Sequence, residues 1–212
     1  MLKVKSPRKK KRFLKNRQII MEAAQELFSL KGFEQTTMAD IAKSAEIAAG
    51  TIYLYFKSKE ELFYALIQEG MRNLLEDLKN AVSTEKQPDH RLQLLVQIPF
   101  EFFEKNRDFY KIYLRELPSC TSVEVRKNKR KFFEGYVEYV NLLENCIQEK
   151  LKAKKIQANK SREVAFLIKG AVDSLIFKYM LEESSQTLTQ QTDFLVKFFN
   201  WGLNSIKYKE PE

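Results

Sequence analysis

The chain has 212 residues, of which 44% are hydrophobic, and a net charge of +9. This length holds two modest domains or one large one, with ample apolar material for a core, and only six glycines and five prolines favour long helices over a turn-rich β protein. No apolar run approaches the length of a membrane span, and the basic N-terminus is not followed by an apolar core, so the sequence predicts a cytoplasmic protein without membrane span or signal peptide.

Positive charge is concentrated in the N-terminal part of the chain. Residues 1–60 hold 13 Lys or Arg against 6 Asp or Glu, whereas the remaining residues hold 24 against 22. A surface that binds nucleic-acid phosphates requires such a concentration, although a basic face that only promotes solubility has the same composition.

Few residues are suited to catalysis or metal binding. Cys120 and Cys146 are the only cysteines, and His90, the only histidine, stands in a polar loop. Because there is no nucleophile–base pair and no metal-ligand spacing, we expect no catalytic residue, no metal site and no cofactor, and hence no enzyme. Two isolated cysteines also fit a reducing cytosol, without a disulfide framework.

The first twelve residues, MLKVKSPRKKKR, are dense in positive charge and contain Pro7. We expect residues 1–12 to form a disordered arm, which either contacts DNA phosphates or serves only as a solubilising tail. A helix is predicted from Phe13 to Lys31, because apolar residues recur there at helical spacing and Gly32 follows as a C-terminal stop.

Residues 36–62, TTMADIAKSAEIAAGTIYLYFKSKEEL, have the pattern of a helix-turn-helix. A threonine caps a first short helix, and a break at residues 46–49 precedes a second short helix over residues 50–56. If Ile52 and Phe56 face the core, three hydroxyl-bearing residues are left facing outward, where they suit phosphates and base edges. They are Thr51, Tyr53 and Tyr55.

This stretch resembles the DNA-binding motif of the TetR (tetracycline repressor) family of bacterial regulators, whose usual pattern reads T-T-x-x-D-I-A-x-x-A-G-V-S-x-G-T-I-Y-x-Y-F-x-S-K-E-E-L. Nearly every fixed position is matched. Ser58 is expected to cap the next helix, with Glu61 completing a capping box. Glu46 stands where the family has a glycine in the turn, so a positive φ there would carry strain, and Ala48 replaces a serine that caps the recognition helix.

The resemblance implies base and phosphate contacts at matching positions of this chain. These are Thr37, Ala39, Ala49, Gly50, Thr51, Tyr53, Tyr55 and Lys59. Thr51 and Tyr53 are expected to reach phosphates or thymine methyls, and Tyr55 and Lys59 are expected to reach phosphates. Ala49 and Gly50 have no hydrogen-bonding side chain, so their part would be close backbone approach, and DNA shape would contribute much of the specificity.

From Ser58 onward the sequence is typical of helices throughout. They are predicted over residues 58–82, 91–105, 108–117, 123–154, 161–183 and 189–208. Pro99 should kink or break the second of these. We therefore expect an all-α fold, with an N-terminal three-helix helix-turn-helix head over residues 13–60 and a helical ligand-binding and dimerisation body over residues 61–212.

Aromatic residues are dense on the middle helices of the predicted body. Large rings pack imperfectly around a kinked helix, so they indicate either an apolar cavity with a few phenols or a filled helical core. The resemblance favours the cavity, because family members usually bind an inducer in this body. The predicted ligand-binding residues are Phe102, Phe103, Phe109, Tyr113, Phe133 and Tyr136.

The last two helices carry apolar stripes wider than packing within one chain requires. Gly170 and Gly202 lie inside them, each at a cost of about 1 kcal/mol relative to alanine, which a close helix crossing would explain. We expect a four-helix bundle completed by a second subunit, with an internal core as the alternative. The predicted interface residues are Leu167, Ala171, Leu175, Phe194, Phe198 and Trp201.

Together these expectations describe a ligand-responsive bacterial transcriptional regulator, acting as a repressor. It would bind palindromic operator DNA as a homodimer and be released by a small apolar or amphipathic effector that moves the heads away from the spacing of successive major grooves. The alternative is a non-specific DNA-binding or helical interaction protein without a ligand. The expected partners are double-stranded DNA, a second copy of the chain and the effector, with no membrane.

Overall fold

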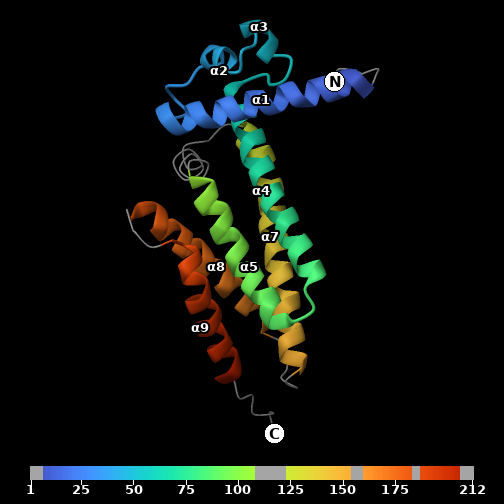
Figure 1. Ribbon diagram of the computed structural model, residues 1–212, viewed down its shortest axis with the longest axis vertical. Helices are drawn as coiled ribbons and strands as arrows, with labels where there is room; N and C mark the ends of the chain where they lie inside the picture. The colour runs from blue at the N-terminus through green and yellow to red at the C-terminus, as the bar shows by residue number, and fades with distance from the viewer. Residues whose placement is uncertain (1–6, 108–122, 154–159, 183–186, 206–212) are drawn as a thin grey trace. The chain divides into compact units, whose positions relative to one another are not determined.

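The computed structural model describes residues 7–107, 123–153, 160–182 and 187–205, which form helices and no strand (Figure 1). The helices are α1 (Pro7–Lys31), α2 (Met38–Ser44), α3 (Ala49–Ile52), α4 (Lys59–Thr84), α5 (Pro88–Lys105), α7 (Val123–Ala153), α8 (Ser161–Leu181), the 3₁₀ turn η1 (Thr189–Gln191) and α9 (Thr192–Ser205). The helix expected over residues 108–117 lies outside the described ranges. In the parts of the chain described, no helix is both long and apolar enough to cross a lipid bilayer.

Two compact units make up the fold, and α4 contributes to both of them. The first unit contains α1, α2, α3 and α4 up to Glu69, and the second begins at Gly70 and contains the rest of α4, α5, α8 and α9. α7 is shared in the same way, since its residues from Arg130 onward belong to the second unit. Within the first unit, α2 and α3 lie on one side of α1 (Figure 1).

α1 begins earlier than the sequence predicted. It starts at Pro7 and not at Phe13, so the described part of the basic arm is helical where we expected disorder. Proline suits a first helical turn, because its φ is already helical and its missing N–H would have no partner there. At the other end Gly32 has a φ of 87°, which confirms the predicted stop.

The core of the first unit is built from rings and branched side chains. Phe28, Phe33 and Phe63 are buried and pack edge to face or tilted, with centroids 5.2–6.1 Å apart. Ile41 of α2 and Ile52 of α3 are fully buried. Each such side chain removed from water contributes roughly 1.5–3 kcal/mol, so this small core holds the short helices α2 and α3 in place.

The two threonines before α2 have separate roles. Thr37 caps α2: its Oγ1 accepts a hydrogen bond from the Asp40 backbone N–H (3.1 Å), and the Asp40 carboxylate accepts one from the Thr37 N–H (3.0 Å). These hydrogen bonds from the Thr37 side chain and backbone lower the pKa of Asp40. Thr36 is instead buried, and its hydroxyl donates to the Gly32 carbonyl at 2.7 Å, which ties the α1–α2 loop to the end of α1.

α5 lies inside the second unit and contacts α8, η1 and α9. It continues through Pro99, so the predicted break is not observed. Proline cannot donate to the carbonyl four residues earlier, which is that of Leu95, but the buried Tyr139 hydroxyl of α7 donates to this carbonyl instead. Burial and the nearby Asp173 carboxylate hold the pKa of Tyr139 well above its ordinary value, so the hydroxyl remains a donor.

Charged side chains join the helices of the second unit. Lys150 of α7 is buried and donates to Asp89 at the start of α5 and to Asn200 of α9. Arg91 pairs with Glu149 at 2.8 Å, which makes a second link between α5 and α7. A buried ammonium group is tolerated only with such partners, so Lys150 fixes the mutual register of three helices.

Candidate nucleic-acid interface

α2, the turn and α3 form a helix-turn-helix with strain at one position. Glu46 has a φ of 53°, as predicted from its place in the turn. A left-handed conformation costs a residue with a Cβ on the order of 1 kcal/mol. The turn is closed by a hydrogen bond from the Ile47 N–H to the Ala42 carbonyl (2.9 Å). Ala48 is the N-cap residue of α3 and provides no side-chain hydrogen bond, also as predicted.

α3 is shorter than expected. It ends at Ile52, and residues 53–55 form turns in place of the predicted helix to Phe56. Ile52 and Phe56 are buried as predicted, and the Phe56 N–H still donates to the Ile52 carbonyl at 3.0 Å. The chain is thus held at both residues while the backbone between them is free to leave helical geometry.

Tyr55 faces α1 and not outward, which corrects its predicted orientation. Its ring stacks on Phe13 with centroids 4.6 Å apart, and its hydroxyl accepts a hydrogen bond from the Asn16 amide at 3.0 Å. Next to it, the Arg17 guanidinium lies 5.1 Å from the centre of the Phe56 ring and pairs with Glu69 at 3.0 Å. These contacts fasten the segment that follows α3 to the N-terminal half of α1.

Lys59 is engaged within the protein. Its ammonium group donates to the Phe33 carbonyl at 2.6 Å and to the Glu34 carbonyl at 3.3 Å, and it lies 4.3 Å from the centre of the Phe33 ring. It therefore joins the first turn of α4 to the α1–α2 loop. Its role at a phosphate stays a prediction, and it would require exchange of these hydrogen bonds.

The cap of α4 follows the predicted capping box with a shift of one residue. The Ser58 hydroxyl accepts from the Glu61 N–H at 3.2 Å, as expected of an N-cap. The Glu61 carboxylate accepts from the Lys57 N–H at 2.7 Å, one residue before the cap. Both backbone donors are satisfied, so the start of α4 is fixed directly behind the recognition segment.

The remaining predicted DNA contacts lie on the surface of the first unit. Thr37, Ala39, Ala49, Gly50 and Tyr53 are exposed, and Thr51 is half-buried. A Cβ added at Gly50 would meet no atom within 4 Å, so the protein itself does not require glycine there. Sequence reasoning missed Leu54, which is 61% exposed beside Tyr53 and is suited to a thymine methyl.

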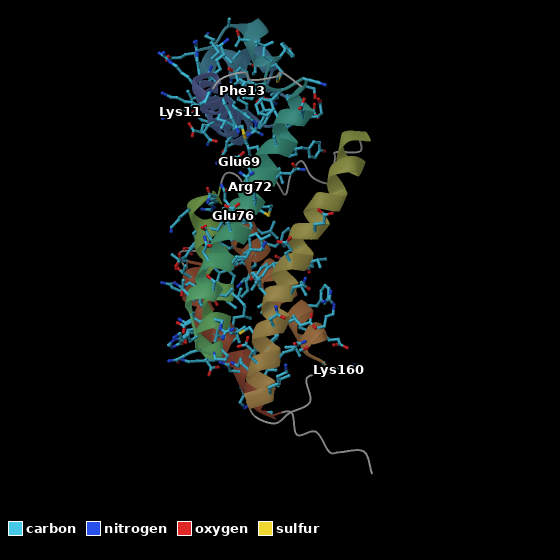
Figure 2. All side chains as sticks on the ribbon, turned by 90° about the vertical axis from the view of Figure 1, so that its right-hand side faces the viewer. Lys11, Phe13, Glu69, Arg72, Glu76 and Lys160 are labelled. Carbon is cyan, nitrogen blue, oxygen red and sulfur yellow. The ribbon has the colours of Figure 1, made fainter. Side chains whose placement is uncertain are left out.

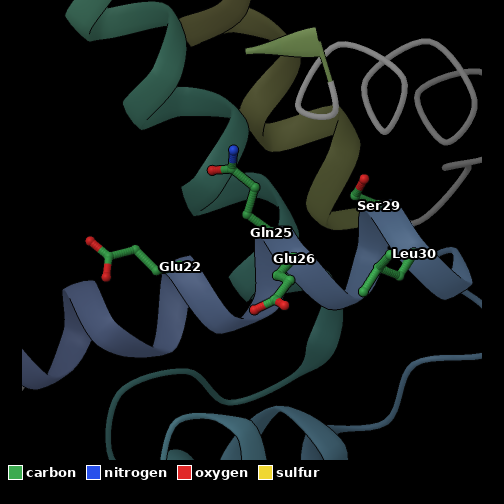
Figure 3. Close-up of a pocket in the computed structure, with 5 residues that line it drawn as sticks. All are labelled: Glu22, Gln25, Glu26, Ser29 and Leu30. Carbon is green, nitrogen blue, oxygen red and sulfur yellow. The ribbon is translucent and has the colours of Figure 1, made fainter. Parts of the chain in front are cut away.

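One hollow of the first unit is lined by residues of the C-terminal half of α1 (Figure 3). It is lined by Glu22, Gln25, Glu26, Ser29 and Leu30. Two carboxylates in the lining repel phosphate, so this part of α1 is unsuited to DNA.

The predicted ligand-binding residues are brought together only in part. On α5 the rings of Phe102 and Phe103 pack edge to face at 5.2 Å, with Phe103 buried. On α7 Tyr136 is half-buried. Phe109 and Tyr113, and the side chain of Phe133, lie outside what the structure describes. The ligand site as a set stays a prediction.

Sequence reasoning missed Lys169, a buried cation of α8. Its ammonium group lies 4.6 Å from the Tyr136 ring centre and 5.4 Å from that of Tyr139, and it donates to Asp173. Burial lowers the pKa of Lys169, and the Asp173 carboxylate opposes this. The available signal was a lysine inside the apolar run VAFLIKGAV.

The predicted interface residues are largely uncovered in the single chain. Leu167 is 65% exposed and Trp201 is 71% exposed, and Phe194 and Phe198 are exposed as well. Ala171 and Leu175 are half-buried. A Cβ added at Gly170 or Gly202 would meet nothing within 4 Å, so among the helices that the structure describes none makes the close crossing that these glycines suggested.

Two family models match the chain and divide it close to the boundary between its units. Residues 20–66 match the bacterial regulatory proteins of the tetR family, and residues 67–200 match the C-terminal region of the YsiA-like proteins. The chain belongs to the tetR family of bacterial regulatory proteins. The predicted resemblance is confirmed, and this chain is a DNA-binding transcriptional regulator of the tetR family.

Relatives match most of the length of this tetR-family chain. The fatty acid metabolism regulator protein of Bacillus subtilis is 24% identical over 187 residues, which cover 88% of this chain and 94% of the relative. The nucleoid occlusion factor SlmA of Haemophilus influenzae is 24% identical over 204 residues, covering 93% and 92%. One relative is named as a metabolism regulator and the other as a nucleoid occlusion factor, and neither name is that of an enzyme.

Solved structures confirm the all-α fold. FadR from Bacillus subtilis, solved in complex with stearoyl-CoA, superposes with a TM-score of 0.73 at 23% identity, covering 90% of this chain and 99% of that one. The fatty acid degradation regulator FadR from Bacillus halodurans gives a TM-score of 0.73 at 22% identity, with the same coverage.

Proposed function

We propose that this protein is a cytoplasmic repressor without catalytic activity, which binds a palindromic operator as a homodimer through α3 and is released by a long-chain acyl thioester. The observation that carries the DNA part is the surface at α3. There Gly50, Tyr53 and Leu54 are exposed while Ile52 and Phe56 anchor the segment from below. A backbone with small or hydroxyl-bearing side chains suits close approach to a major groove.

The exposed apolar faces of α8 and α9 support the dimer. Leu167, Phe198 and Trp201 would be desolvated by the same faces of a second subunit, forming a four-helix bundle. A two-fold dimer can place two recognition helices about 34–36 Å apart, in successive major grooves of one face of the duplex. The predicted interface thus also sets the spacing of the operator half-sites.

The effector class is supported by the relatives and by the chemistry of the second unit. The B. subtilis structure contains stearoyl-CoA, and the B. subtilis relative is named for fatty acid metabolism. In this chain, Phe102 and Phe103 offer apolar surface for an acyl chain, and the buried Lys169 offers a cation for an anionic group. Because α4 contributes to both units, a ligand that displaces α4 in the body would change the presentation of α3.

Operator selection followed by ligand titration tests this function. Duplexes selected from a random pool by the purified dimer are expected to share an inverted repeat, protected symmetrically in a footprint. Stearoyl-CoA should then release the operator at concentrations where free coenzyme A, which has the same head group without the acyl chain, does not. If the selected pool shows no repeat, the specific-regulator proposal is wrong; if neither compound changes operator affinity, the effector class is wrong.

The likeness to a protein named as a nucleoid occlusion factor supports a second candidate, a DNA-binding protein without a ligand. The response to a ligand distinguishes this candidate from the ligand-responsive regulator. A chain of this kind would keep its operator in the presence of every acyl-CoA tested, and native mass spectrometry of the purified dimer would show no retained small molecule. An acyl-CoA mass bound to the dimer would favour the regulator.

A further inference from the structure

The N-terminal end of α1 carries charges that the helix itself disfavours. Five of the six residues from Pro7 to Arg12 are Lys or Arg, all of them exposed, and Lys15 adds another exposed cation one turn later. The first turn contains no acidic residue. The helix dipole places partial positive charge at this same end, and cations three or four residues apart repel, so both effects oppose the helix.

The next two turns fix this basic end beside the recognition segment. Phe13 stacks on Tyr55, Asn16 donates to the Tyr55 hydroxyl, and Arg17 lies over the ring of Phe56. Tyr55 and Phe56 follow α3 within four residues, and all these residues belong to one compact unit. Lys11 and Phe13 lie on this end of α1 (Figure 2). The cations are therefore held at a constant position relative to α3.

We infer that the basic end of α1, residues 8–15, is a second DNA-binding surface, which contacts phosphates of the duplex that α3 reads. The inference rests on the proposed function, since it requires that α3 engage DNA. The contacts of the basic end would be electrostatic and independent of base sequence. They would be made by cationic side chains, which α3, with the sequence AGTI, does not have. Phosphates at this end offset both the repulsion between the cations and the opposition of the helix dipole.

An anionic lipid surface is negatively charged, as DNA is, but it fits the position of the basic end beside α3 less well. Phe13 and Asn16 hold the basic end next to α3. A partner that binds α3 is therefore also within reach of the basic end, and the partner of α3 is DNA. Helical order from Pro7 onward also keeps the cations in register, as phosphates at fixed spacing require. DNA is accordingly the occupant that the placement favours.

Salt dependence of operator binding tests the inference. In the test variant Arg8, Lys9, Lys10, Lys11 and Arg12 are all replaced by Gln, which removes charge but retains helix propensity. In the control, five exposed lysines of the second unit are replaced by Gln: Lys86, Lys105, Lys152, Lys178 and Lys197. Both variants lose the same net charge, so a general electrostatic effect would move both equally.

Operator affinity is then measured over a series of KCl concentrations. The slope of log K against log salt is expected to become shallower by about 0.9 for each phosphate that the test variant no longer neutralises, summed over both subunits of the dimer. Affinity should fall at least tenfold at low salt, with the ranking of mutated operators unchanged, and the control should keep the wild-type slope. Replacing the three lysines by Arg should also keep it.

Two results would overturn the inference without touching the proposed function. A test variant that binds the operator with the wild-type slope shows that the basic end makes no phosphate contact. Equal shifts in test and control variants show that only net charge matters. Circular dichroism and sedimentation check that the test variant folds and dimerises, and hydrogen exchange of residues 8–15 should slow on adding operator but not on adding anionic vesicles.

Discussion

At the scale of single residues, the two neighbouring tyrosines of the recognition segment have opposite surroundings. Tyr53 is 54% exposed, whereas Tyr55 stacks on Phe13 and accepts a hydrogen bond from Asn16. One is therefore free to meet DNA, and the other stabilises the unit that presents it. The two tyrosines point in different directions because the chain leaves the helix after Ile52 and forms a turn.

Substitution of each tyrosine separates the two roles. Tyr53→Ala is expected to leave thermal unfolding and the dimer unchanged, while operator affinity falls at least tenfold, because an interaction worth on the order of 1 kcal/mol or more is removed from each half-site. Tyr55→Ala should instead lower the free energy of unfolding by about 1–3 kcal/mol, because the ring stacking and the hydrogen bond are absent. Calorimetry and gel-shift titration measure both. Unchanged operator affinity of Tyr53→Ala would remove this residue from the DNA-binding set.

Substitution of Gly50 tests operator binding separately from folding stability. A Cβ added there has none of the described atoms of other residues within 4 Å, so Gly50→Ala should fold with equal or higher stability, by up to about 1 kcal/mol from helix propensity. Operator affinity should nevertheless fall, since the methyl group would stand between the backbone and the base edges. Gly135→Ala is the matched control, as its added Cβ also meets nothing within 4 Å. Equal affinities of the two variants would exclude close backbone approach at Gly50.

At the scale of elements, local signals were predictable from the sequence and tertiary ones were not. The Gly32 stop, the Glu46 turn and the uncapped Ala48 depend on residues within one helical turn, and each was predicted correctly. The inward orientation of Tyr55 depends on partners about forty positions earlier, and Lys59 bonds to carbonyls 25 and 26 residues away. A periodic sequence pattern does not show these distant partners, so the sequence predicted that Tyr55 and Lys59 are available to DNA.

α5 shows the same limit, because its continuity comes from another helix. The sequence places a proline in the helix but cannot show that the Tyr139 hydroxyl supplies the missing donor to Leu95. Similarly, the apolar stripe of α8 was evident, whereas the burial of Lys169 beside the rings of Tyr136 and Tyr139 required the packed structure. Side-chain hydrogen bonds across elements were thus the main information that the sequence lacked.

A double-mutant cycle tests whether the Tyr139 hydroxyl replaces the backbone donor that Pro99 lacks. Tyr139→Phe leaves the buried Leu95 carbonyl without a donor and should cost about 1–3 kcal/mol of unfolding free energy. In the double variant with Pro99→Ala, the new N–H at residue 99 can donate to that carbonyl, so the cost of removing the hydroxyl should shrink by about 1 kcal/mol or more. Urea unfolding gives all four values. An equal cost of Tyr139→Phe in both backgrounds would show that the hydroxyl does not replace the proline's missing donor.

At the scale of the whole molecule, dimerisation and DNA reading depend on each other. The exposed rings of α8 and α9 are apolar surface that a second subunit would cover, and Gly170 and Gly202 leave space for its helices. One head alone reads only a half-site, and coupling two heads multiplies the affinity through effective concentration. Disruption of the dimer should therefore weaken operator binding far more than removal of any single base-reading side chain.

Charge placed in the predicted interface tests this dependence. Leu167→Glu combined with Trp201→Glu would bury carboxylates against their symmetry mates, so we expect a folded monomer by sedimentation equilibrium and operator affinity reduced at least a hundredfold, since one head must bind without the other. Leu30→Glu is the control: Leu30 is 72% exposed on α1, outside the predicted interface, and its substitution should change neither mass nor affinity. A double variant that stays dimeric would place the interface on another surface. A monomer that binds the full operator as tightly as the wild type would instead show that each head reads DNA independently, because coupling through the body would then contribute nothing to affinity.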